Sequence, residues 1–161
     1  MYVPENFAVA DETVLHQFIG RYDFALLVTA AGGVPTASHL PILLETESSG
    51  AVLKGHMARA NPQWQEFPSI DEALVIFQGP HAYVSPSWYA SAPMVPTWNY
   101  TAVHAYGKPA LIDDAANQFR IAFRHPAQRE EGGLYAGGVK QTEHAVRICF
   151  DAPWEVVPII A

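Results

Sequence analysis

The sequence predicts a mainly β fold, a small β-barrel with peripheral helices. Short apolar runs of strand length recur along the chain, clusters of glycine and proline separate them, and little of the sequence shows helical spacing. We expect six short strands in all. Many short strands with regular turn signals are typical of closed β architectures, in which each strand pairs with two neighbours.

One amphipathic helix is expected ahead of the strands. Either Asp11 or Thr13 can cap its start, and the helical pattern ends near Gly20. This stretch therefore predicts a short helix beside the sheet. The apolar residues that recur at helical spacing are Val14, Leu15, Phe18 and Ile19.

Five apolar runs predict most of the strands. The first two flank an Ala-Ala-Gly-Gly turn and therefore predict a hairpin, and Ser48-Ser49-Gly50 makes the next turn. The last of the five should bend at Gly107-Lys108-Pro109. The runs are residues 24–29, 35–44, 51–57, 73–78 and 101–112.

Other segments have a weaker pattern. The stretch ARANPQWQEFPSI is expected to be a short helix or a loop bounded by Pro62 and Pro68. Residues 79–100 contain several prolines and are expected to form a loop. The C-terminal run VRICFDAPWEVVPIIA could form one or two short strands of its own.

Composition fits a single domain that spans residues 1–161. Half of the 161 residues are apolar, which is enough for one core. Cys149 is the only cysteine, so an intrachain disulfide is excluded and the reducing cytoplasm is the expected location. The sequence has no leader pattern and no run of the roughly 18 to 20 apolar residues that a membrane helix needs, so we expect no membrane partner.

The charge balance bears on nucleic-acid binding. Sixteen acidic and nine basic residues give a net charge of −7. A broad surface that tracks phosphates needs the opposite sign, so only a local basic patch or a dimeric array could bind DNA.

Two histidines raise the question of a metal site. His39 and His56 both lie near strand ends, and they could act as a pair of metal ligands. No carboxylate accompanies them at a defined spacing, so a hydrogen-bonding or packing role is the better interpretation. We predict no metal.

A second group of residues could bind a phosphate. Arg59 and Asn61 follow a predicted strand and precede a possible helix start, where a charged fork and an amide donor can hold an anion. Lys54 and His56 would add donors to the same corner. The alternative is an ordinary capped surface turn, and the residues leave both open.

The segment from Val75 to Gly107 combines aromatic rings, prolines and polar side chains, as a site for a planar ligand would. Its tryptophans could instead be core, because aromatic side chains bury large areas wherever they occur. Ser85 and Ser87 lack the Gly-x-Ser-x-Gly setting of a nucleophile, and no phosphate-binding or dinucleotide-binding glycine motif is present. The tryptophans in question are Trp64, Trp88 and Trp98.

Five separated motifs resemble the PaiB family in sequence, order and spacing. This family is described as FMN-binding negative transcriptional regulators, and its members are split β-barrel flavoproteins related to pyridoxamine 5′-phosphate oxidase. The resemblance covers about residues 1–112. The motifs are Met1-Tyr2-Val3-Pro4, His39-Leu40-Pro41, GHMARANPQW (55–64), VIFQGPHAYVSPSWY (75–89) and VPTWNY (95–100).

Beyond about Asp114 the sequence departs from the family pattern. Only Pro153-Trp154 matches the expected C-terminal motifs, and the last strand of the family is expected to be missing. Residues 114–161 are therefore predicted to be an atypical segment.

The resemblance implies an FMN-binding split β-barrel that forms a homodimer, with flavin sites at the interface between the two copies. Donors to the FMN phosphate would come from the corner at Arg59, and the isoalloxazine ring needs an apolar wall with a few polar edges. The predicted cofactor-binding residues are His39, Lys54, His56, Arg59, Asn61, Gln78, His81, Trp98 and Asn99.

Two classes of function follow from the resemblance. The first is a negative transcriptional regulator that binds promoter DNA through a local basic surface, although no helix-turn-helix is visible. The second is a small FMN-dependent oxidoreductase, a flavin reductase or oxidase, in which the protein mainly positions the cofactor. No catalytic residue is assigned in either case. A third possibility is that the altered tail has abolished cofactor binding and left a plain dimer.

Overall fold

The computed structural model describes residues 7–47, 50–91, 93–112 and 143–149. Its strands form a closed barrel in the order β1-β2-β3-β6-β5-β4, and all neighbours are antiparallel. The mainly β barrel with peripheral helices is confirmed. Its elements are α1 (Glu12–Arg21), β1 (Phe24–Thr29), η2 (Ala31–Gly33), β2 (Thr36–Glu47), β3 (Gly50–Ala58), η3 (Pro62–Ser69), β4 (Ala73–Val84), η4 (Pro86–Trp88), β5 (Thr97–Ile112) and β6 (Glu143–Cys149), where η marks a 3₁₀ helix.

The core lies inside the barrel and is built by strand alternation. Leu27 on β1 and Val75 and Phe77 on β4 are fully buried, whereas their sequence neighbours are more exposed. Burying a side chain of this kind stabilises the fold by roughly 1.5 to 3 kcal/mol. This alternation leaves the other side chains of the same strands on the outer face of the barrel.

Asp11 is the N-cap of helix α1, which settles the cap that the sequence left open. The Asp11 carboxylate accepts a hydrogen bond from the backbone N–H of Thr13 at 2.8 Å. Leu15 and Ile19 are the buried residues of α1, and they join the barrel core. In the described part of the chain, no helix is long and apolar enough to cross a membrane.

Two strands change partner partway along, and these changes close the barrel. β2 pairs with β1 up to Pro41 and with β3 from Ile42 onward. β5 pairs with β4 up to Gly107 and with β6 from Lys108. The bend predicted at Gly107-Lys108-Pro109 therefore falls where β5 leaves one sheet for the other.

Strand β6 corrects the prediction that the last strand is missing. Residues 143–149 pair with β3 on one side and with β5 on the other, and they complete the barrel. The run predicted to form a strand begins at residue 146, and its first four residues, 146–149, lie in β6. The remainder of the atypical segment, residues 113–142 and 150–161, lies outside the described residues.

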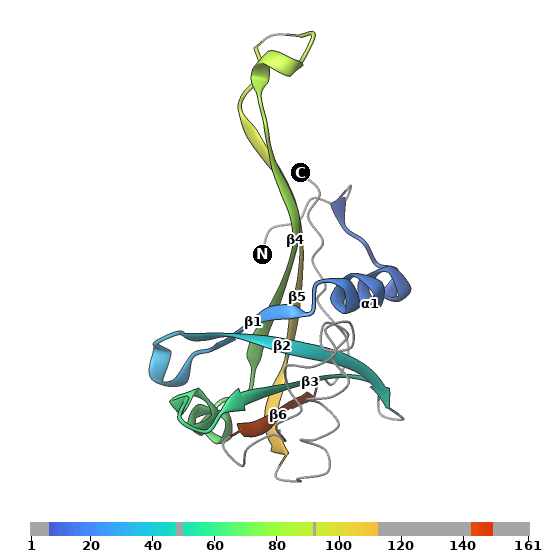
Figure 1. Cartoon of the computed structure of the whole chain (residues 1–161). Coiled ribbons are helices and arrows are strands. Elements are labelled where there is room, and N and C mark those ends of the chain that lie inside the picture. Colours follow the sequence, from blue (N-terminus) through green and yellow to red (C-terminus); the bar gives the residue numbers. More distant parts are fainter. Residues whose placement is uncertain (1–6, 48–49, 92, 113–142, 150–161) are drawn as a thin grey trace, which may run out of the picture.

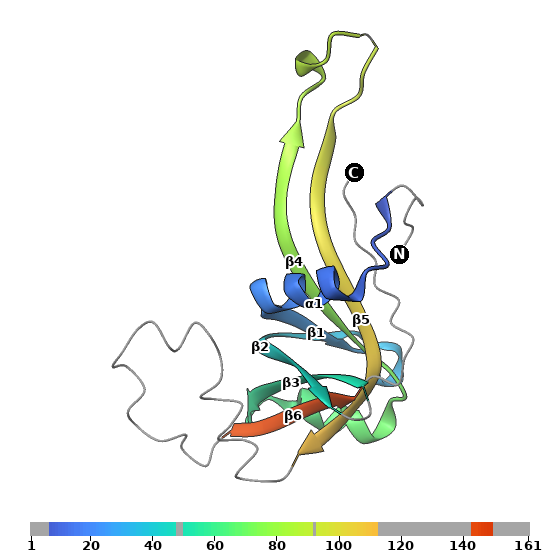
Figure 2. The same ribbon diagram turned by 90° about the vertical axis from the view of Figure 1, so that its right-hand side faces the viewer.

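β4 and β5 extend beyond the barrel as a long two-stranded arm (Figures 1 and 2). We use the name "arm" for residues 79–100. The loop predicted for residues 79–100 is wrong at its two ends, because His81–Val84 pair with residues 97–100 after a bulge at Gln78/His81. Between the strands, the described residues form the 3₁₀ helix η4 and irregular backbone, as expected of a loop. The arm exposes large apolar side chains, among them Trp88 (71% exposed) and Val95 (75% exposed).

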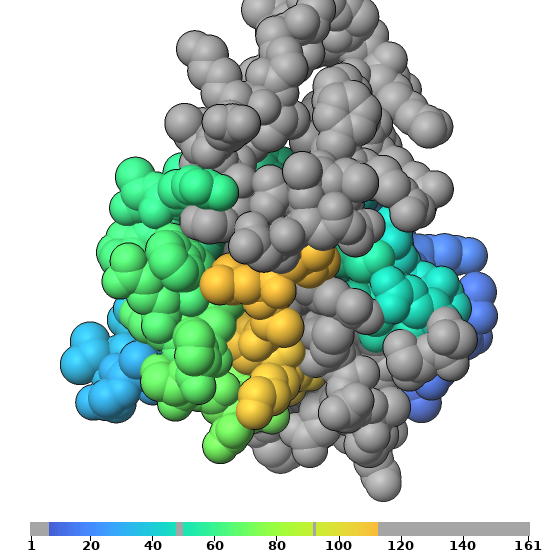
Figure 3. Space-filling model, turned by 90° about the horizontal axis from the view of Figure 1, so that it is seen from below, coloured from blue at the N-terminus to red at the C-terminus, as the bar shows by residue number. Residues whose placement is uncertain are grey.

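The 3₁₀ helix η3 lies at the lower end of the barrel and tethers the β1–β2 hairpin (Figure 3). The buried side-chain amide of Gln63 donates to the carbonyl of Leu27 at 3.2 Å, to Thr29 Oγ1 at 3.1 Å and to the carbonyl of Thr36 at 3.2 Å. The Glu66 carboxylate accepts hydrogen bonds from the hydroxyls of Thr29 (2.6 Å) and Thr36 (2.8 Å). The predicted short helix or loop is therefore a structural anchor.

Stability should depend on pH through Glu66. The hydrogen bond from Thr29, with a further one from Thr36, lowers the pKa of Glu66 below its ordinary 4.5. The carboxylate therefore stabilises the fold above pH 4.5, and this stabilisation is lost as the pH falls through the lowered pKa. We expect Glu66→Ala to reduce the free energy of unfolding by about 1 kcal/mol at neutral pH, the modest value of a solvent-screened interaction.

Urea unfolding at neutral and acidic pH measures this effect. The difference between Glu66→Ala and the unmodified protein should shrink at acidic pH, and Glu72→Ala, a change at an exposed side chain, serves as the control. A difference that is the same at both pH values would show that the carboxylate charge plays no part.

Candidate functional site

A pocket of about 390 Å³ lies at the root of the arm. It contains three of the predicted cofactor-binding residues, Gln78, His81 and Trp98, but Asn99 is not part of its wall. No aspartate, glutamate, lysine or arginine lines it, so the pocket suits an uncharged planar group better than an anion. The lining residues are Ile76, Gln78, Gly79, His81, Trp98, Tyr100, Thr101, Ala102 and His104.

The shape of the arm's root depends on Gly79. A Cβ atom at this position would overlap the hydroxyl of Thr101 and would lie 2.8 Å from the ring of Phe18 on α1. Both contacts are closer than side-chain atoms tolerate, so a larger residue would displace the helix or the strand. The absence of a side chain thus lets α1 pack against the strand beside the pocket.

Trp98 forms an aromatic side of the pocket. Its ring centroid lies 6.1 Å from that of His81 and 5.7 Å from that of Tyr83, which meets it edge-on. Trp98 is 55% exposed, so it is not a core residue, and the alternative left open by the sequence is settled for this tryptophan. An exposed indole held at a pocket wall can stack on a flat ligand.

His104 is a pocket residue that the sequence analysis did not select. Its side chain is half-buried, and its Nδ1 atom is buried without a hydrogen-bond partner among the described residues. Burial lowers the pKa of His104 below its ordinary 6.5, so the imidazole is neutral at neutral pH. The alternation of β5 was the signal that could have found it, because it places His104 opposite the buried Val103 and Ala105.

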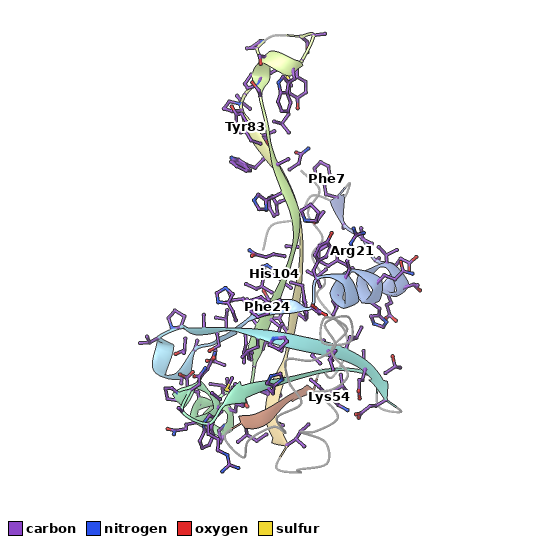
Figure 4. All side chains as sticks on the ribbon, viewed as in Figure 1. Phe7, Arg21, Phe24, Lys54, Tyr83 and His104 are labelled. Atoms are coloured by element: carbon purple, nitrogen blue, oxygen red, sulfur yellow. The ribbon has the colours of Figure 1, made fainter. Side chains whose placement is uncertain are left out.

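One row of paired residues connects the pocket to His39. His39 on β2 pairs with Leu26, Leu26 pairs with Ile76, and Ile76 pairs with His104. Paired residues of an antiparallel sheet share a face, so all four lie on the outer face of the barrel. Phe24 (64% exposed) stacks on His39 with ring centroids 6.1 Å apart, and Figure 4 labels Phe24 and His104 on the barrel below the arm.

Lys54 lies lower on the barrel than His104, and its charge is already engaged (Figure 4). Its ammonium is 2.7 Å from carboxylate oxygens of both Glu45 and Glu47. Burial acts to lower the pKa of Lys54, but the two carboxylates raise it above its ordinary 10.5. This geometry disfavours Lys54 as a contact for a phosphate.

Of the other residues predicted to bind the phosphate, Asn61 is held by local hydrogen bonds, whereas Arg59 is exposed. Asn61 caps η3, since its side chain accepts from the N–H of Gln63 at 3.0 Å and donates to Ser38 Oγ at 2.8 Å. This geometry is that of the capped turn that the sequence left as an alternative. Arg59 is exposed and its guanidinium makes no ion pair within the described ranges, while His56 is half-buried on β3.

The remaining candidates serve local structure. Trp64 packs partly against the core and donates from Nε1 to the carbonyl of Arg59 at 3.1 Å. Ser85 caps η4 at the tip of the arm, next to Trp88.

Among the residues that the structure describes, no three histidine, cysteine, aspartate or glutamate side chains gather as metal ligands would.

Solved structures share this architecture. The "Putative Pyridoxamine 5'-phosphate oxidase" from Listeria innocua matches with a TM-score of 0.59 at 14% identity, over 93% of this chain and 98% of its own. The FAD and heme binding protein from Mycobacterium smegmatis matches with a TM-score of 0.64 at 15% identity, over 95% of this chain and 76% of its own. Identities this low show the fold alone. The chain therefore has the split β-barrel fold that these structures share.

Sequence comparison then defines the family. The family described as "Putative FMN-binding domain" matches residues 1–147. The protein "Protease synthase and sporulation protein PAI 2" of Bacillus subtilis is 42% identical over 123 residues, which cover 75% of this chain and 59% of that protein. The chain belongs to this FMN-binding family and is similar to PaiB, so FMN is its cofactor.

The extent of the family match corrects the boundary drawn from the motifs. The match reaches residue 147, beyond the 112 residues covered by the resemblance, and it includes most of β6. The motifs end earlier because β6 contributes a strand to the barrel without a conspicuous sequence pattern.

Proposed function

We propose that this chain is an FMN-binding negative transcriptional regulator of the PaiB type, which acts as a homodimer. The observation that carries the proposal is the uncharged pocket at the root of the arm, in a chain of an FMN-binding family. The name of its Bacillus subtilis relative links that protein to protease synthesis and sporulation, which supports a regulatory role. The match spans 59% of that relative, so the partners of the whole protein are part of the proposal.

In the proposed site the isoalloxazine ring occupies the pocket. Trp98 stacks against the ring, and Gln78 and His81 supply polar contacts at its rim. The phosphate binds to Arg59, the exposed cation of the predicted corner, which follows the end of β3. When bound, FMN supplies one- or two-electron redox chemistry, and the protein sets its position and surroundings.

Trp98→Ala should weaken FMN binding by about 1 to 3 kcal/mol, the usual contribution of an aromatic side chain stacked on a flat heterocycle. The fold should be retained, because the indole is 55% exposed. Titration of FMN followed by its fluorescence measures the affinity. Val34→Ala, which shortens an exposed side chain outside the pocket, is the control, and an unchanged affinity for Trp98→Ala would remove the indole from the site.

The arm supports the proposal of a homodimer. A two-stranded ribbon is marginally stable in water unless it packs against another surface. This ribbon exposes Tyr83 (44%), Trp88 (71%) and Val95 (75%), which a second copy would cover. In a symmetric pair each arm reaches the other copy, so one copy can provide the pocket and the other can add contacts to the same flavin.

DNA binding by the FMN-loaded dimer tests the regulatory role. Gel filtration should give the mass of two chains. The dimer should bind its promoter fragment with an affinity that falls steeply as salt rises, because local basic residues must replace counterions on the DNA. A dimer that binds FMN but shows no preference for any fragment of the neighbouring genomic DNA would contradict the regulatory role.

An FMN-dependent oxidoreductase is the second candidate. The observation that favours it is the presence of His81 and His104 in the same pocket wall, where a titratable side chain can serve a reacting substrate. Reduction of bound FMN by NADH or NADPH, followed by repeated turnover with an electron acceptor, would support this function. Single reduction without turnover would favour the regulator.

A further inference from the structure

The uncharged pocket contains hydrogen-bonding groups that no internal contact explains. The amide of Gln78 and the imidazole of His104 both belong to its wall. Within the described part of the chain, Gln78 forms no side-chain hydrogen bond and His104 Nδ1 has no partner. The Gln78 amide is exposed at the pocket, whereas His104 Nδ1 is buried. Polar groups of a pocket wall that no internal contact engages can fix the orientation of a ligand.

The imidazole of His104 presents a donor to the pocket. Its neutral ring carries one proton, and on the buried Nδ1 this proton would be a donor without an acceptor. We assign the proton to Nε2, which leaves the buried Nδ1 as an unpartnered acceptor and makes Nε2–H a donor. His104 offers one N–H donor at a fixed place on β5.

Gln78 lies close enough to act on the same ligand edge. It pairs with Ala102, two residues before His104, and Ile76 pairs with His104. Residues in this diagonal relation on one face have Cβ atoms roughly 7 to 8 Å apart. Together the two side chains can present the N–H donor of His104, the carbonyl acceptor of the Gln78 amide and the N–H donor of the same amide, in this order.

We propose that His104 and Gln78 bind the imide edge of the flavin's pyrimidine ring. His104 Nε2–H donates to one ring carbonyl, Gln78 Nε2–H donates to the other, and Gln78 Oε1 accepts the ring N–H between them. This inference rests on the proposed function, which puts the ring in the pocket. It makes the pocket specific for a cyclic imide, and His104 a binding residue beyond those predicted.

Side-chain variants test the histidine. His104→Phe keeps a ring but removes the donor, and it should weaken FMN binding about tenfold. His104→Gln replaces the donor and should restore the affinity to within about threefold of the unmodified protein. A thermal melt of each variant shows whether it folds. Equal affinity for His104→Phe, or a loss that His104→Gln does not restore, would overturn the role of the donor.

A modified ligand tests the imide contact without changing the fold. FMN methylated at the imide nitrogen cannot donate to Gln78, so the unmodified protein should bind it about tenfold more weakly than FMN. In Gln78→Ala the two ligands should bind alike. If the unmodified protein binds both ligands equally, the inference is wrong while the proposed function stands. If it does not bind FMN at all, both are wrong.

Discussion

Gln63→Ala is expected to lower the free energy of unfolding by about 2 to 4 kcal/mol. The substitution removes the buried Gln63 amide, whose two N–H hydrogens are shared among three acceptors, and it leaves the carbonyls of Leu27 and Thr36 without this donor. It also opens a cavity between η3 and the β1–β2 hairpin, which adds to the loss. Chemical denaturation followed by tryptophan fluorescence measures the change.

Gln65→Ala is the matched control for this experiment. Gln65 lies on the same 3₁₀ helix but is exposed, so its truncation should change stability by less than about 0.5 kcal/mol. If the two variants lost the same stability, η3 would not act as the anchor of the hairpin, and the barrel end would be held by other contacts.

Arg59→Ala is expected to weaken FMN binding by about 1.5 to 3 kcal/mol, the contribution of a charge-assisted hydrogen bond to a phosphate. Arg59 is exposed, and its guanidinium makes no ion pair in the described part of the chain, so it can contact a ligand without first breaking one. Arg59→Lys keeps the charge but loses the fork, and it should recover only part of the affinity. Titration of FMN against each variant gives the dissociation constants.

Arg21→Ala controls for the loss of a positive charge. Arg21 is also exposed, but it ends α1 and lies over the ring of Tyr22 at 5.6 Å from its centroid. Its removal should leave FMN affinity unchanged. Equal losses for both arginines would indicate a general electrostatic effect, and no loss for Arg59→Ala would place the phosphate elsewhere.

The barrel could be predicted from the sequence because its strands bury one face. The run FALLVT is strand β1 at the predicted bounds, and its alternate residues Ala25 and Leu27 are buried as a half-buried strand requires. Closure of the barrel could not be predicted in the same way. β6 pairs with β3 and β5 across a long separation in sequence, and no local pattern encodes that pairing.

The arm was missed for a related physical reason. From His81 to Tyr83 and again from Trp98 to Tyr100, every residue is exposed, so no buried face gives the period of two that marks a strand. Pro80, near the root of the arm, and Pro96, just before β5, also favoured the prediction of a loop.

The candidate site was predicted in part. Residue type and motif identified Gln78, His81 and Trp98, and the pocket brings them together. Lys54 was included for its charge, but its two carboxylate partners are visible only in three dimensions. His104 was not selected, although the alternation of β5 puts it on the outer face, and the sheet register then brings it to the pocket wall.

A crystal structure of the purified chain with FMN tests the central claim most directly. We expect two copies in contact, with the isoalloxazine ring in the pocket at the root of the arm and its imide edge at Gln78 and His104. The phosphate should contact Arg59. A complex in which this pocket is empty and the flavin binds another face of the barrel would contradict the account.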